Sequence, residues 1–286
     1  TKLDDYHNVK FKSPSGSLYN YWLPAFINND HFIRSQQYLL NFISIILCGP
    51  EGTKENEFKP PMVMKTLPPI LVQTALHFLK GTIKLDNASI DAYIQVYILL
   101  IRLVKLFPEI QKSIDQEVND FYAREENRNV KVTEDLEEFI IKQGLSTKGI
   151  EDSEAMNVLL KEYLCRRVTE IVGKDENLKG KDQFEGSVES FMKESQLENQ
   201  LFLANIESAR LFLNKDILND EDQLGGLLDE SVKKEFQKKV EWIKDNVNEN
   251  WETFIEGLGQ QKYVTNENVM KEYIDNVYKI ACKKVS

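Results

Sequence analysis

The positions of the prolines constrain the fold of this chain more than any other feature of its sequence. All eight prolines lie at or before Pro108, and the 178 residues that follow contain none. Proline inside a helix removes a backbone hydrogen bond and clashes with the preceding turn, which costs about 3 kcal/mol. Because apolar residues recur every three to four positions through the proline-free stretch, this stretch is predicted to form one helix after another.

The sequence therefore predicts an all-α fold with roughly ten helices. Strand signals, in which β-branched residues alternate between turn dipeptides, are scarce. No repeat with a fixed period of roughly 33 to 47 residues is legible, as an ankyrin, tetratricopeptide or HEAT-type array would show. Helices joined by short loops would stack either as an irregular α-solenoid, which resembles armadillo or HEAT proteins in architecture only, or as a two-part helical bundle. The sequence favours the solenoid over the bundle.

Composition divides the chain into four stretches. Residues 1–17 are polar and linker-like, and residues 18–173 form a helical subdomain whose prolines end at position 108. Residues 174–196 form a polar segment that connects it to an acidic helical subdomain at residues 197–286. Residues 1–107 carry 11 basic and 8 acidic groups, whereas the remainder carries 25 basic and 38 acidic groups. The net charge of −10 therefore comes from the C-terminal part of the chain.

Local signals predict several helix boundaries in the N-terminal half. A first helix, interrupted by Pro24, is expected at Leu18–Ile27, and a second at His31–Cys48, where a Gly-Pro pair ends it. Pro68 and Pro69 are expected in the first turn of the third helix, where backbone N–H groups lack partners in any case. Ser89 is a plausible N-cap for the fourth helix.

Further signals apply to the core and to the C-terminal half. Tyr93 and Tyr97, one helical turn apart, are interpreted as core residues more readily than as partner anchors. Ser195, with a glutamate three residues on, predicts a capping box ahead of a helix. The longest helix is expected at Glu230–Glu256, because one continuous apolar stripe runs along it.

Charge and cysteine content exclude some classes of function. An acidic body repels phosphate backbones, so nucleic-acid binding is not expected. The longest apolar run, Tyr93–Phe107, is too short for a bilayer span and contains Arg102 and Lys105. Three widely separated cysteines do not form a secreted disulfide framework, which favours a reducing cytoplasmic or nuclear compartment. The chain begins with threonine, and we expect it to be part of a longer protein.

No motif predicts a catalytic residue, a metal or a cofactor. The histidines and cysteines lack the short spacings of metal ligands, and Cys165 is interpreted as a small structural hydrophobe. The glycine-containing loop 48–54 superficially resembles a phosphate-binding turn. It includes Glu51, which would repel a phosphate, so it is interpreted as a helix-ending loop. Acidic pairs such as Glu137-Glu138 are expected on solvated helix faces or in loops.

The remaining candidate site is aromatic. Tyr19, Tyr21 and Trp22 lie beside the polar opening segment, and tyrosine and tryptophan are favoured interface anchors. They fit the alternative of ordinary core residues equally well. The sequence thus predicts a non-enzymatic interaction or scaffold domain that presents a helical groove to a partner peptide or helix of another protein. The acidic C-terminal part favours a partner with a basic segment. The alternative is a helical enzyme or enzyme-regulatory domain. An enzyme would show a concave pocket with convergent polar residues, whereas an interaction module would show a groove without perturbed titrating groups.

Overall fold

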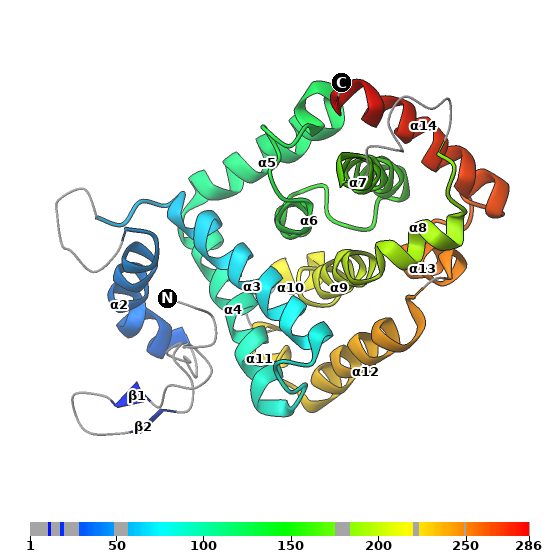
Figure 1. The fold of residues 1–286 in the computed structure, drawn as a ribbon. Helices are drawn as coiled ribbons and strands as arrows, with labels where there is room; N and C mark the ends of the chain where they lie inside the picture. Colours follow the sequence, from blue (N-terminus) through cyan, green and yellow to red (C-terminus); the bar gives the residue numbers. More distant parts are fainter. Residues whose placement is uncertain are drawn as a thin grey trace.

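The computed structural model describes residues 11–12, 18–19, 29–48, 57–174, 184–219, 223–248 and 250–285. The fold is all-α, as predicted, and Figure 1 shows its arrangement. The helices are α2 (Asn29–Cys48), α3 (Met62–Lys80), α4 (Asn87–Leu106), α5 (Pro108–Ala123), the 3₁₀ helix η2 (Glu125–Arg128), α6 (Leu136–Leu145), α7 (Ser153–Lys174), α8 (Val188–Glu194), α9 (Gln196–Phe212), α10 (Lys215–Asn219), α11 (Gln223–Gly226), α12 (Glu230–Asn246), α13 (Trp251–Leu258) and α14 (Glu267–Val285).

A two-stranded ladder precedes the helices. Strand β1 (Phe11–Lys12) pairs antiparallel with β2 (Leu18–Tyr19). The predicted helix at Leu18–Ile27 is therefore wrong at its first two residues, and its other residues lie outside the described part of the chain. A helix beginning at Leu18 would place Pro24 in its interior, where proline is unfavourable.

Helix α3 begins earlier than the prolines indicate. Pro61 is its N-cap residue, and Pro68 and Pro69 lie inside the helix rather than in its first turn. Neither proline has an N–H group, so the carbonyls of Met64 and Lys65, four residues earlier, lack their helical donors. The predicted first-turn position was wrong because the Pro60-Pro61 pair, not the later one, marks the start.

Helix α4 also begins before its predicted cap. Asp86 is the N-cap residue, and its Oδ1 accepts a hydrogen bond from the Ser89 backbone N–H at 2.9 Å. Ser89 is therefore in the first turn, not at the cap. Aspartate and serine are both good cap residues, and the earlier of the two takes the position.

An aromatic cluster joins α3, α4, α9 and α12. Tyr93 and Tyr97 are fully buried, which confirms their interpretation as core residues. The Tyr93 ring stacks on Phe236 with centroids 5.2 Å apart, and the Tyr97 ring lies 5.0 Å from Phe212. The Tyr93 hydroxyl donates to Ser208 Oγ at 3.2 Å, so its polar atom is satisfied inside the core.

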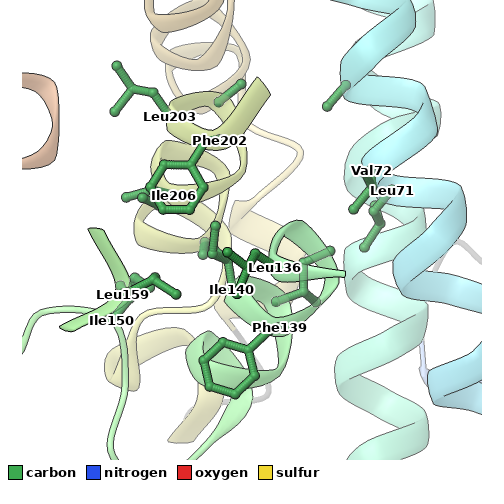
Figure 2. Close-up of a cluster of buried hydrophobic side chains, with 14 of the residues drawn as sticks. Leu71, Val72, Leu136, Phe139, Ile140, Ile150, Leu159, Phe202, Leu203 and Ile206 are labelled. Carbon is green, nitrogen blue, oxygen red and sulfur yellow. The ribbon is translucent and has the colours of Figure 1, made fainter. Parts of the chain in front are cut away.

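Helix α9 lies at the centre of the fold and packs against α3, α6, α8, α12 and α13 (Figure 1). Figure 2 shows buried side chains of α3, α6, α7 and α9 meeting in one cluster, among them Leu71, Ile140, Leu159 and Phe202. Helix α7 packs against α14. Helices from both predicted subdomains thus contribute to the core, and the division at 174–196 stays a prediction.

The predicted capping box at Ser195 does not form. Ser195 directly follows α8, and its backbone has φ −103° and ψ 15°, whereas a capping residue needs an extended conformation. Its hydroxyl makes no capping hydrogen bond. Because α8 runs almost directly into α9, there is no extended residue at which a cap could form.

The predicted long helix at Glu230–Glu256 is two helices, α12 and α13. Asn250 ends the break by accepting hydrogen bonds from the backbone N–H groups of Glu252 and Thr253. Asparagine side chains compete with the backbone for hydrogen bonds, and three of them lie between 246 and 250. The Gln200 side chain of α9 donates to the Val247 carbonyl at 2.8 Å, which satisfies the end of α12.

Candidate binding cleft

An acidic cleft of about 530 Å³ lies between the start of α3, one face of α5, the first turns of α6 and the loop before α6. Its volume is within the range of ligand-binding sites in proteins. Two lysines, Lys65 and Lys142, also line it. Six carboxylates line the cleft: Glu109, Glu117, Asp120, Glu134, Asp135 and Glu138.

Helix α5 supplies one wall through a polar stripe. Glu109, Ser113, Glu117 and Asp120 are spaced by four, four and three residues, and this spacing places them on one face of a helix. At 1.5 Å per residue, the stripe extends for about 16 Å. The adjoining face of α5 is apolar and buried, so the polar stripe lies on the solvent side of an amphipathic helix.

The start of α6 supplies the facing wall. Asp135 is the N-cap residue, and its Oδ1 accepts from the Glu138 backbone N–H at 2.8 Å. Burial, and then the negative charge of Asp135, raise the pKa of Glu138 to about 7. The same causes raise the pKa of the neighbouring Glu137 to about 7. The prediction of a solvated Glu137-Glu138 pair was therefore wrong, since both carboxyls are half-buried beside other acids.

The two lysines of the cleft are placed differently. Lys142 Nζ lies 2.6 Å from Glu117 Oε2, so this ion pair joins α6 to α5 across the cleft. Lys142 also lowers the pKa of Glu138, against the larger effects that raise it. No ion pair of Lys65 is found within the described ranges.

Apolar side chains complete the cleft. Ile110 and Phe139 are buried and line it, and Val132 is 60% exposed at its edge. Met64 and Lys65 of α3 also line the cleft. The cleft thus combines apolar surface with many hydrogen-bond acceptors.

A second cleft, of about 630 Å³, lies between η2, α7 and α14. Its charges are mixed: Glu162 pairs with Arg166 at 2.9 Å, and Lys161 Nζ lies 5.2 Å from the centre of the Tyr273 ring. Cys165 lines this cleft and is 6% exposed, in keeping with its interpretation as a small buried side chain.

Helix α2 carries exposed apolar side chains. Tyr38 is 76% exposed and Ile45 is 52% exposed, and both precede the end of the helix at Cys48. Of the predicted aromatic partner site, Tyr19 is described only as part of strand β2, and Tyr21 and Trp22 lie outside the described residues. This site stays a prediction, and the structure neither joins it to nor separates it from the acidic cleft.

Neither a metal site nor a membrane-spanning helix is found in the part of the chain that the structure describes. Within the ranges that the structure describes, no group of three or more histidine, cysteine, aspartate or glutamate side chains is arranged to hold a metal ion. No helix in the same ranges has both the length and the apolar character that crossing a bilayer requires. The loop 49–54, compared above with a phosphate-binding turn, lies outside the described residues.

Sequence reasoning missed the acidic cleft, although two signals for it are present. The α5 stripe has helical spacing, and Asp135 with Glu138 three residues on is a capping pattern. What the sequence does not show is that α3, α5 and α6 bring these acids together. Comparison of the chain with protein-family models, with curated proteins and with solved structures finds no significant match.

Proposed function

We propose that this chain is a protein-interaction module that binds a basic segment of another protein in the acidic cleft. The observation that carries the proposal is the excess of six carboxylates over two lysines around an apolar floor, in a concave site of suitable volume. Lysine and arginine offer only donors, which suits a cleft whose polar groups are mostly acceptors. The acidic cleft and the acidic C-terminal half also disfavour nucleic acid as the partner.

Charge and apolar surface have separate roles in this proposal. The carboxylates steer a basic segment toward the cleft and set its orientation, an effect that weakens with salt. The exposed Val132 and the partly exposed Met64 supply apolar area that a partner's apolar residue would bury, next to the buried side chains of Ile110 and Phe139. The occupant is therefore an amphipathic basic segment rather than a purely charged one.

A second candidate function is an enzyme. The cleft meets the criterion given above for an enzyme, because it is concave, gathers polar residues and holds titrating groups with perturbed pKa values. The pKa of Glu138, raised to about 7 inside a cleft, is the value that a general acid or base needs at neutral pH. Crowding by neighbouring acids also produces such a shift without any catalytic role. The test begins with a thermal-shift screen for a metabolite that the chain binds and turns over. A Glu138→Gln variant that loses this turnover, yet still binds a basic peptide, would favour the enzyme.

Fluorescence anisotropy tests the interaction proposal with a labelled helical peptide that has lysines on one face and leucines on the other. The expected result is saturable binding that weakens about tenfold in a Glu109→Gln/Glu138→Gln double variant. The matched control is Glu235→Gln/Glu241→Gln on α12, which removes two exposed carboxylates away from the cleft and should change the affinity by less than about twofold.

The comparison peptide replaces each lysine with glutamate. Equal affinity for the two peptides, or equal weakening by both double variants, would refute the proposal, because binding would then not depend on the cleft's charge.

We also infer a bundle-like packing, which is supported by the contacts of α9 with helices far away in the sequence. The cytoplasmic or nuclear location stays a prediction.

A further inference from the structure

The ion pair between Lys142 and Glu117 has an unusual position. It lies inside the acidic cleft, joins its two facing walls and places an ammonium group where the carboxylates are concentrated. Glu138, one turn before Lys142 on α6, lies on the same side of the helix and lines the same cleft. Lys142 thus occupies the kind of position that a cation from a partner would take.

We propose that Lys142 is an internal competitor, whose ammonium group holds the partner's place on Glu117 in the unbound protein and leaves it when a basic segment binds. This inference rests on the proposed function of the cleft. The Lys142 side chain is 24% exposed and Glu117 is 49% exposed, so the pair is accessible to solvent and to an incoming cation. A solvent-exposed ion pair of this type contributes little to stability, so releasing it requires little free energy.

A competitor and a structural brace differ in their consequences for binding. Removing a competitor leaves Glu117 unneutralised, so binding of a cation becomes tighter. Removing a brace loosens the contact between α5 and α6, so binding and thermal stability both fall. Removing any positive charge from the cleft also strengthens cation binding by simple Coulomb attraction, and the design must separate this general effect.

Lys65 provides the matched control. It is the other lysine that lines the cleft, and no ion pair of its side chain is found within the described residues. Lys142→Met and Lys65→Met each remove one positive charge from the cleft and keep an apolar side chain of similar length. The competitor inference predicts that Lys142→Met tightens binding of the lysine–leucine peptide by about fivefold or more, and by clearly more than Lys65→Met.

A second comparison uses the acids of α5. It is made first with Lys142 unchanged and then repeated in the Lys142→Met variant. Glu117→Gln should weaken peptide binding less than Glu109→Gln does, because Lys142 already neutralises Glu117, whereas no ion pair of Glu109 is found among the described residues. In the Lys142→Met background this order should reverse or the difference should vanish. The cycle keeps the inference testable even if one variant folds poorly, as judged by circular dichroism.

The outcomes separate this inference from the proposed function. If the wild-type chain binds the peptide through the cleft, but Lys142→Met leaves the affinity unchanged or weaker, the competitor inference is overturned and the proposed function stands. If the wild-type chain and the Lys142→Met variant both fail to bind, both are overturned. A gain in Lys142→Met equal to that in Lys65→Met also overturns the inference, since it would show general electrostatics alone.

Discussion

A methyl group added at Gly257 tests the packing of α13 against the central helix. A Cβ atom at this position would lie 2.5 Å from Cδ2 and 3.0 Å from Cδ1 of Leu203, a fully buried residue of α9. Both distances are too short for carbon atoms in contact, so Leu203 would have to move. Figure 2 shows Leu203 within the buried cluster of α9, where the surrounding side chains limit such movement.

The expected effect of Gly257→Ala is the difference between two opposing terms. Overpacking a buried site costs about 1–3 kcal/mol, whereas removing a glycine from a helix gains roughly 0.5–1 kcal/mol. The midpoints of the two terms differ by about 1 kcal/mol, so the variant should lose about this much unfolding free energy, which corresponds to a fall of a few degrees in Tm. Urea unfolding followed by circular dichroism measures the loss, with the m-value checked for a change in the unfolded state.

Gly173→Ala in α7 is the matched control, because a Cβ at that exposed helical position meets no atom within 4 Å. It should leave stability unchanged or slightly increased. Leu203→Ala is destabilising alone but makes room for the new methyl group, so Gly257→Ala should cost less in that background. A Gly257→Ala variant as stable as the wild-type chain would show that α13 does not pack on α9 as closely as described.

Two further predictions concern buried hydroxyl and carboxyl groups. Tyr93→Phe removes the hydroxyl that donates to Ser208 in the core, and thermal unfolding should show a loss of about 0.5–1.5 kcal/mol; no loss would mean that this hydrogen bond does not form. The pKa values of Glu137 and Glu138 are raised to about 7 in the folded chain, so their protons are bound more tightly in the folded state than in the unfolded state. Stability should accordingly fall as pH rises from about 4.5 to about 7, by roughly 1–2 kcal/mol after discounting for partial exposure. Urea titrations across this range should show the decline, and Glu137→Gln should flatten it; a rise in stability instead would contradict the assigned burial.

The sequence predicts the helices better than their ends. Absence of proline and helical periodicity are local properties, so α2 begins two residues before the predicted start at His31 and ends, as predicted, at Cys48. Caps and breaks are decided by competition between neighbouring residues. The apolar stripe of α12 continues into α13, yet asparagines and a hydrogen bond from Gln200 of α9 interrupt the helix at Val247. Periodicity alone gives no sign of that partner.

The acidic cleft could be predicted only in part for the same reason. The α5 stripe is visible in the sequence, but Lys65, Glu117 and Glu138 meet only because three helices pack together. The raised pKa of Glu138 depends on burial and on the orientation of Asp135, which acts as a helix cap. Such effects belong to tertiary structure, and composition led instead to the expectation of a solvated acidic pair.

The central position of α9 has a consequence for the synthesis of the chain. Tyr93 and Tyr97 of α4 are buried against Phe212 and Phe236, residues that leave the ribosome more than a hundred positions later. Until then the aromatic side chains of α3 and α4 lack the surface that covers them in the finished fold. Contacts this distant in sequence slow folding and leave apolar surface open to aggregation. The nascent N-terminal half is therefore expected to depend on chaperones until α12 has emerged.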